Sequence, residues 1–237
     1  MLHPLPDGTL AKLAALDAAA EGTVRAGMLL PWANVAVETE LPRLGLRHTV
    51  FHHARLVPAS RTTAIDTSFW HGLREASVHA LDSLSHIPLD TVMLACTSAG
   101  FTDGPPLPSG VVTAFDALLR ALTDAAVARV VLVTPYPTPV TEAEAAALTE
   151  AGMEVLAHAS LGLTDGYPEV PPGQILALVE QLPEAAVEAA GAIVLSCTGW
   201  HTLPAVAELE HRFGKPVISS NLAMALLATR APAGVGP

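Results

Sequence analysis

Two cysteines are the residues of this sequence best suited to chemistry. Cys96 and Cys197 are the only cysteines among 237 residues, and each is followed by a threonine. Each also ends an apolar, strand-like run, DTVMLAC at 90–96 and AGAIVLSC at 190–197. A turn that leads from such a strand toward a helix directs backbone N–H groups and the positive end of the helix dipole into the crevice. We therefore expect a lowered pKa for both thiols, and a place to hold negative charge beside each sulfur.

A pair of thiols on opposite sides of one small carboxylate supports two kinds of reaction. One sulfur can take a proton from one face of a carbon while the other returns a proton to the opposite face. Alternatively, one sulfur can add to a carbon while the other protonates the neighbouring carbon. Neither reaction requires a metal or an organic cofactor, so we expect none. The competing interpretation is a pair of buried structural cysteines, since free Cys is among the most buried residues; the symmetric placement favours function.

Strand-like runs alternate with helix-length stretches along the chain. The expected strands cover 24–31, 48–57, 90–96, 128–135, 153–159, 190–197 and 215–220. The expected helices cover 67–84, 111–126, 141–152, 173–190, 203–214 and 220–229, after a first helix that precedes residue 24. Strands that alternate with helices predict an α/β fold with parallel sheets flanked by helices.

The chain also repeats itself. LLPWANVAVETELPRL, from Leu29, aligns with VTPYPTPVTEAEAAAL, from Val133, and VMLACTSAGF aligns with IVLSCTGWHT, so that Cys96 matches Cys197. We expect two lobes related by a pseudo-twofold axis, with the active site in the cleft between them. The first lobe is expected to cover 1–108, with 217–237 returning to it, and the second to cover 109–216. Because ligands of open α/β sheets bind beyond the carboxyl ends of the strands, facing lobes would bring both thiols to one cleft.

Composition narrows the class of protein. Hydrophobic residues make up 51% of the chain, but in blocks shorter than the ~20 residues of a membrane span. The net charge of -11, with no basic cluster, argues against nucleic acid and anionic membranes as partners. The N-terminus lacks a basic start followed by an apolar run and a cleavage site, which predicts a cytoplasmic protein. In that reducing compartment both cysteines are expected as free thiols.

Four stretches carry a resemblance to a known family. GMLLPWANVAVETEL, ACTSAGF, TPYPTPVTEAE and LSCTGWHTLPAVAELEHRFGKPVISSNLAMA resemble the maleate cis-trans isomerase and arylmalonate decarboxylase branch of the aspartate/glutamate racemase superfamily. The likeness runs from Val24 to Leu227 and implies two similar α/β lobes with the site between them and no cofactor. It also implies catalytic and substrate-binding roles. The catalytic residues would be Cys96 and Cys197, and the substrate-binding residues would be Asn34, Thr97, Ser98, Tyr136 and Thr198.

The resemblance implies a reaction as well. A Cys96 thiolate would add to an alkene, Cys197 would supply a proton, and rotation and elimination would follow. The expected function is a cofactor-independent isomerase or racemase of a small carboxylate or dicarboxylate, maleate-like. Two alternatives stay open: an arylmalonate-type decarboxylase with Cys197 as proton donor, and a non-catalytic carboxylate-binding protein. Decarboxylases of this branch carry glycine in place of the first thiol, which makes plain decarboxylation less favoured here.

Other features of the sequence add little chemistry. The isomerases carry an asparagine where this chain has Gly166, and Trp200 and His201 follow the second thiol, which puts maleate itself in question. His48, His52 and His53 do not share one strand face and have no carboxylate with them, so no metal site is expected. No serine-hydrolase, dinucleotide or phosphate-loop motif is present. Self-association into a homo-oligomer stays open.

Overall fold

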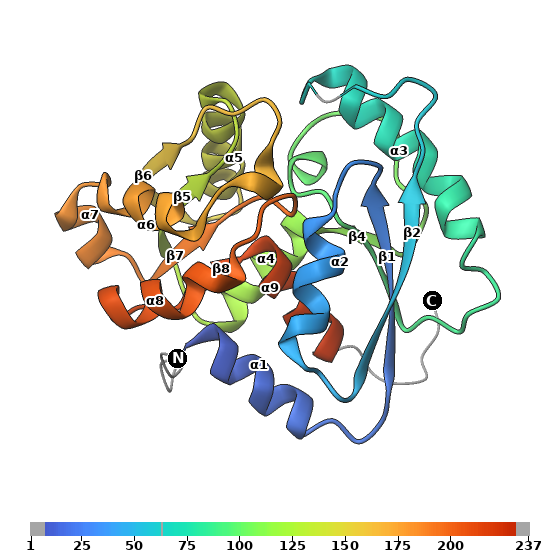
Figure 1. Cartoon of the computed structure of the whole chain (residues 1–237), viewed down its shortest axis with the longest axis horizontal. Coiled ribbons are helices and arrows are strands. Elements are labelled where there is room, and N and C mark those ends of the chain that lie inside the picture. Colours follow the sequence, from blue (N-terminus) through green and yellow to red (C-terminus); the bar gives the residue numbers. More distant parts are fainter. Residues whose placement is uncertain (1–7, 63, 231–237) are drawn as a thin grey trace.

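The computed structural model describes residues 8–62 and 64–230, which form two lobes that lie next to each other (Figure 1). The first sheet contains β1 (Val24–Pro31), β2 (Thr49–Leu56), β3 (Thr91–Leu94) and β4 (Val111–Thr113), in the order β2-β1-β3-β4. The second contains β5 (Arg129–Thr134), β6 (Glu154–Ser160), β7 (Ala192–Leu195) and β8 (Val217–Ser219), in the order β6-β5-β7-β8. All neighbouring strands are parallel. The α/β fold with two similar lobes is confirmed.

Helices connect the strands and cover the sheets. They are α1 (Thr9–Ala18), α2 (Ala36–Glu40), α3 (Thr67–Asp82), α4 (Ala114–Asp124), α5 (Thr138–Glu150), α6 (Pro172–Glu180), α7 (Glu184–Ala189), α8 (Leu203–Phe213) and α9 (Ser220–Arg230), with short 3-10 turns η1 (Leu41–Leu44), η2 (Ser98–Gly100) and η3 (Tyr167–Glu169). Figure 1 shows α4 and α9 near the centre of the molecule, where they pack on each other; α9 also contacts α1 and β1.

The two lobes repeat the same strand register where it matters for the site. At the ends of the central strands, Leu29 pairs with Leu94 in the first sheet and Val133 pairs with Leu195 in the second. The next residues continue the correspondence, since Ala95 N donates to Leu29 O and Ser196 N donates to Val133 O, both at 2.9 Å. Cys96 and Cys197 therefore occupy matching places, just beyond the carboxyl ends of β3 and β7.

Local signals set the helix boundaries. The side chain of Asp66 caps α3 by accepting a hydrogen bond from Phe69 N at 3.0 Å. Thr113 and Asp116 form a capping box that starts α4 at Ala114, so the first three residues of the helix expected at 111–126 are instead strand β4. The single helix expected at 173–190 is two helices, because Pro183 has no N–H to continue the first one.

The expected lobe boundaries near 108 and 216 need correction. Strand β4, at Val111–Thr113, pairs with β3 and belongs to the first sheet, although the second lobe was expected to begin at 109. Strand β8, at Val217–Ser219, pairs with β7 and belongs to the second sheet, although it was expected in the first lobe. Strand β4 has three residues, too short to give a periodic signal of its own, whereas β8 lies within the strand expected at 215–220 and only its lobe was wrong. The division of the chain into lobes stays a prediction in other respects, and residues 231–237 lie outside the described part.

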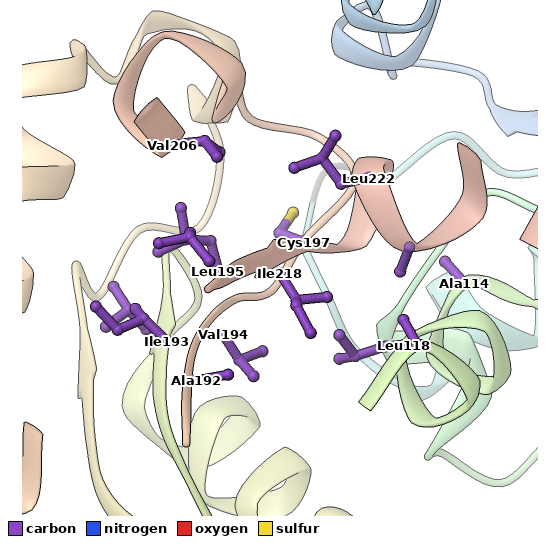
Figure 2. Close-up of a cluster of buried hydrophobic side chains, with 14 of the residues drawn as sticks. Ala114, Leu118, Ala192, Ile193, Val194, Leu195, Cys197, Val206, Ile218 and Leu222 are labelled. Carbon is purple, nitrogen blue, oxygen red and sulfur yellow. The ribbon is translucent and has the colours of Figure 1, made fainter. Parts of the chain in front are cut away.

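One continuous apolar core spans both lobes. It includes side chains of β1, α4, α9 and all the strands of the second sheet, whereas a smaller cluster fills the space between β2, β3 and α3. Figure 2 shows Cys197 among the side chains of the large core, with Leu195, Ile218 and Leu222 nearby. The site is thus anchored to packed, rigid elements. Among the described residues, no helix has both the length and the apolar character needed to span a bilayer.

Candidate active site

Both thiols line a single cavity between the lobes. Its volume is about 580 Å³, and the sulfur-bearing residues Cys96 and Cys197 contribute to its wall from the first and second lobe. Both are free cysteines, and only 6% and 5% of their respective surfaces are exposed. The remaining wall comes from segments of both lobes, and its residues are Pro31, Ala33–Val35, Thr62, Ile65, Phe69, Ser98, Tyr136, Thr164–Glu169, Thr198 and Gly199.

Hydrogen bonds between the lobes hold the two cysteine turns together. The Thr198 hydroxyl donates to Ala95 O at 2.7 Å and accepts from Asn34 Nδ2 at 3.0 Å. The hydroxyl of Ser220, the first residue of α9, accepts from Thr97 Oγ1 at 2.9 Å and from Cys197 N at 3.1 Å. Each turn is therefore fixed directly to the other, and α9 joins them from behind.

The Cys96 turn surrounds its sulfur with hydrogen-bonding groups. Cys96 Sγ lies 3.5 Å from Ser98 Oγ, which accepts a hydrogen bond from Trp70 Nε1 of α3 at 3.0 Å. Burial raises the pKa of the Cys96 thiol, while the Ser98 hydroxyl, the Ala99 and Ser98 N–H groups and the positive charge of Arg74 act in the opposite direction.

The Cys197 turn is tighter. Cys197 has φ 137°, a backbone conformation that favours glycine, and Gly199 N donates to Cys197 Sγ at 3.2 Å. Burial raises the pKa of the Cys197 thiol to about 12, although hydrogen bonds from Tyr136 and Gly199 lower it; the nearby Cys96 and Glu144 raise it further. The expectation of a lowered pKa for both thiols is wrong, because desolvation outweighs the donors of the turns.

The aromatic wall of the cavity is neutral. Burial raises the pKa of Tyr136 well above its usual value and also raises the pKa of Tyr167, so both hydroxyls keep their protons. The two rings meet edge to face, with centroids 5.9 Å apart. Tyr136 OH is thereby available as a donor to the Cys197 sulfur or to a ligand oxygen.

The hydrogen-bond donors of this cavity are neutral, so uncharged groups would have to hold an anionic ligand. Its lining side chains, within the described residues, include the acidic Asp165 and Glu169 and no Lys, Arg or His. Asn34 Oδ1 accepts from Val37 N, and one of the two Nδ2 hydrogens is used by Thr198, which leaves the other free. Ser98 accepts from Trp70, and its own O–H can donate either to Cys96 Sγ, 3.5 Å away, or to a ligand oxygen. Together with Tyr136 OH, these groups give three neutral donors.

The structure brings together six of the seven residues expected at the site. Cys96, Cys197, Asn34, Ser98, Tyr136 and Thr198 all line the cavity. Thr97 does not, because the next side chain after Cys96 points away from the cavity, is fully buried, and donates to Ser220. The Thr198 hydroxyl has already given its hydrogen to Ala95 O, so it can only accept from a ligand.

Residues near the second thiol do not all reach the cavity. Trp200 is fully buried and outside the lining. His201 lies between the lobes, with Nε2 2.8 Å from Thr39 Oγ1 and Nδ1 3.0 Å from Pro168 O. Gly166 lines the cavity and has φ 70°. In the described part of the chain, no cluster of three His, Cys, Asp or Glu side chains could hold a metal ion.

Sequence reasoning missed several residues that shape this site. Tyr167 packs on Tyr136 and lines the cavity, but it follows a loop that gives no periodic signal. Ser220 was visible only as part of the GKPV and SN motif. Arg74, on α3, belongs to no motif, and Glu144, on α5, ends the stretch TPYPTPVTEAE without a feature that marks it as functional.

The fold and the two cavity thiols define a two-lobed α/β protein of the racemase-like kind. The arylmalonate decarboxylase family model matches residues 98–234, more than half of the chain. The chain therefore belongs to the arylmalonate decarboxylase family, in the branch that also holds maleate isomerases.

Individual relatives come from both sides of that branch. A maleate isomerase of Nocardia farcinica is 27% identical over 222 residues, covering 84% of this chain and 86% of that protein. An arylmalonate decarboxylase of Bordetella bronchiseptica is 38% identical over 107 residues, 44% of each protein. A solved structure of a cysteine-to-serine variant of the Nocardia farcinica maleate cis-trans isomerase, with a covalently bound succinylcysteine intermediate, has a TM-score of 0.76 at 25% identity, covering 86% of this chain and 90% of that one.

Proposed function

We propose that this chain is a cofactor-independent, two-cysteine isomerase of a small carboxylate or dicarboxylate, with a maleate-like cis-trans isomerisation as the reaction. The observation that carries the proposal is the placement of two free cysteines, one from each lobe, in the wall of one cavity. Maleate isomerases match most of the chain, and one of them forms a covalent adduct on cysteine. A small carboxylate fits a cavity of about 580 Å³ with room to rotate.

The first step is addition of sulfur to the double bond. The Cys96 thiolate forms a bond to one alkene carbon, and the π electron pair moves to the neighbouring carbon, where the adjacent carboxylate delocalises it. The thiol of Cys197 then gives its proton to that carbon. The result is a thioether on Cys96, a single bond between the two former alkene carbons, and a thiolate on Cys197.

The second step reverses the first after rotation. The substrate turns about the new single bond, and the Cys197 thiolate takes a proton back from the same carbon. The electron pair that remains re-forms the double bond and expels the Cys96 thiolate, which restores both thiols to their starting states. Asn34, Ser98 and Tyr136 supply neutral hydrogen bonds to the carboxylate, and these strengthen as charge develops on its oxygens.

Decarboxylation of a substituted malonate is the second candidate. The family match and the relative at 38% identity favour it. In that reaction the carbon–carboxyl bond breaks with loss of CO2, and Cys197 protonates the carbanion that remains. Cys96 has no role in such a reaction, and its presence opposite Cys197 favours isomerisation.

Separate substitutions of the two cysteines distinguish the candidates. Cys96→Ala and Cys197→Ala would each be assayed for conversion of maleate to fumarate and for release of CO2 from an arylmalonate. Loss of isomerisation in both variants supports the proposal. Full decarboxylation in Cys96→Ala, with no isomerisation in the parent, would establish the second candidate instead. Ligand binding without turnover in the parent protein would point to a non-catalytic binding protein. Cytoplasmic location and self-association stay predictions.

A further inference from the structure

The two thiols occupy equivalent places in the repeat, but the charged groups behind them differ. Behind Cys96 lies Arg74, on α3. Its Nη2 donates to Ala99 O at 2.6 Å and to Thr102 O at 3.0 Å, and its Nη1 donates to Pro105 O at 3.0 Å. The guanidinium thus holds the loop that begins with the Cys96 turn and positions the Ser98 and Ala99 N–H groups that face the sulfur.

The charge of Arg74 is not neutralised by a carboxylate. Within residues 8–62 and 64–230, the ion pairs of the protein do not include it, and its partners are backbone carbonyls. The loop also closes tightly over the side chain, since a Cβ at Gly104 would lie 2.7 Å from Arg74 Cδ. A half-buried, unpaired cation interacts more strongly with neighbouring charges than a cation in bulk water does, because the effective dielectric constant is lower.

Behind Cys197 lies a carboxyl group instead. Glu144, on α5, is fully buried, and its Oε1 accepts a hydrogen bond from the hydroxyl of Ser196, the residue before Cys197. Its Oε2 has no partner. An ionised carboxylate with a bare buried oxygen is costly, so the group is held as the neutral acid; burial raises the pKa of Glu144 to about 8.

The repeat itself shows that this arrangement is specific to the second lobe. Glu144 aligns with Glu40, and Ser196 aligns with Ala95, which has no hydroxyl to donate. Glu40 turns to the other lobe, where Leu203 N, Thr202 Oγ1 and Asn221 Nδ2 donate to it. In the second turn, the carbonyl of Thr198 accepts a hydrogen bond from the neutral side-chain amide of Asn221. In the first turn, the carbonyl of Ala99 accepts one from the charged guanidinium of Arg74.

We infer that Arg74 and Glu144 are positioning residues that make the thiol pair unequal, so that Cys96 ionises and acts as the nucleophile while Cys197 keeps its proton and acts as the acid. Arg74 stabilises a negative sulfur in the first turn through its charge and the turn it fixes. Glu144 places no positive charge behind the second turn, and where its carboxyl ionises, above about pH 8, its negative charge opposes a negative sulfur there. The role of this inequality in turnover rests on the proposed function, but the inequality itself does not.

The other titratable groups that face the two sulfurs do not create this difference. Tyr136 and Tyr167 keep their protons, and each thiol opposes ionisation of the other. Asp165 and Glu169 line the cavity but are not among the main influences on either thiol. Arg74 is the one fixed cation whose charge acts on Cys96 among the described residues. Removal of that charge should therefore make Cys96 harder to ionise and leave the ionisation of Cys197 unchanged.

The test is the pH dependence of alkylation of each thiol, measured without substrate. The full-length protein would be treated with iodoacetamide across a range of pH, and peptide mass spectrometry would give a separate rate for Cys96 and Cys197. Each rate is normalised to its own plateau, so differences in access cancel. The variants are Arg74→Gln, Arg74→Lys and Glu144→Gln. Arg129→Gln is the control, because Arg129 is exposed at the opposite end of β5.

In the parent protein, Cys96 should react at a lower pH than Cys197. Arg74→Gln should slow alkylation of Cys96 about three- to tenfold at pH values below its plateau, and leave Cys197 unchanged, because one nearby charge shifts a pKa by roughly half a unit to one unit. Arg74→Lys should restore most of the rate. Glu144→Gln should speed alkylation of Cys197 about threefold above pH 8, where the parent carboxyl ionises.

Three results would overturn the inference. The first is a parent protein in which Cys197 ionises before Cys96; this measurement needs no variant to fold. The second is a shift of the alkylation profiles of both thiols in Arg74→Gln, or a shift of the Cys96 profile in Arg74→Lys as large as that in Arg74→Gln. Either result indicates a loosened turn and no effect of charge. The third is an unchanged Cys96 profile in Arg74→Gln. Because no substrate is present, failure of the proposed isomerase reaction would leave these results intact.

Discussion

The Cys96 and Cys197 turns are built on the same plan and end in different chemical surroundings. Each follows the third strand of a parallel sheet with the same strand order, and each places a sulfur in the wall of one cavity. Yet the first turn has no positive φ at Cys96 and an unpaired guanidinium behind it, whereas the second has φ 137° at Cys197 and a neutral carboxyl behind it. A repeated fold can thus provide two matching thiols, while a few residues outside the motif decide which one is the stronger acid.

The largest expected effect comes from replacing sulfur by oxygen in either turn. Cys96→Ser should abolish covalent addition, because a serine hydroxyl has no base beside it to make it nucleophilic. Cys197→Ser should reduce turnover about 10²- to 10⁴-fold, the usual contribution of a positioned acid or base. Steady-state rates with maleate measure both. Equal, small losses in the two variants would contradict the division of roles.

The next effect concerns the free energy of unfolding and its dependence on pH. The pKa of Glu144 is raised from 4.5 to about 8 by burial, so the folded protein keeps a proton that the unfolded chain releases in this range. Stability is therefore fully present below about pH 4.5 and is lost as the pH rises toward 8. Glu144→Gln removes this dependence, and its stability relative to the parent should rise across the window by on the order of 5 kcal/mol.

Urea unfolding of both proteins at several pH values checks this result. Glu142→Gln is the matched control, because Glu142 is exposed on the same helix. It should leave the pH dependence of the parent as it is. If Glu144→Gln and Glu142→Gln behave alike, the carboxyl of Glu144 is not held neutral by burial.

A smaller effect tests the contact between the two turns. Thr198→Val removes the hydroxyl that donates to Ala95 O and accepts from Asn34, and so leaves two buried polar groups without a partner. The expected loss of stability is about 1–3 kcal/mol. Thr39→Val is a useful comparison, because the Thr39 hydroxyl lies in a more exposed link between the lobes and should cost less. Urea unfolding at neutral pH distinguishes them.

The smallest expected effect on stability tests the difference in backbone conformation between the two turns. At Cys197, with φ 137°, glycine should be more stable than alanine by about 1 kcal/mol, because the alanine Cβ is strained there. At Cys96 the positive φ is absent, so Cys96→Gly should be less stable than Cys96→Ala. Thermal unfolding of the four variants gives both differences, and the same preference at both positions would remove this part of the comparison.

The sequence predicted the features that repeat. Strand-like runs that end in Cys-Thr, and the alignment of Cys96 with Cys197, were enough to anticipate two parallel sheets and one shared site. Strand β4 was not predicted, because three residues carry no periodic pattern. Strand β8 was expected at 215–220, but its sheet was not, because pairing is decided by the neighbouring strand. The lobe boundaries moved for that reason.

The pKa values of the thiols could not be read from the motif. Each turn has the donors that the sequence suggested, but the depth of burial, which dominates both thiols, is a property of the assembled lobes. The same holds for Thr97, whose hydroxyl turns to Ser220 and not to the cavity. Arg74 and Glu144 act across the fold from helices far along the chain, and nothing in their local sequence connects them to a cysteine.

The most direct test of a nucleophile at Cys96 and an acid at Cys197 is to trap the adduct. Each of the variants Cys197→Ala and Cys96→Ala would be incubated with maleate, quenched and digested, and mass spectrometry would locate any residue that gains the mass of one maleic acid. The account predicts an adduct on Cys96 in the first variant and none on Cys197 in the second. An adduct on Cys197, or turnover at the parent rate in either variant, would contradict it.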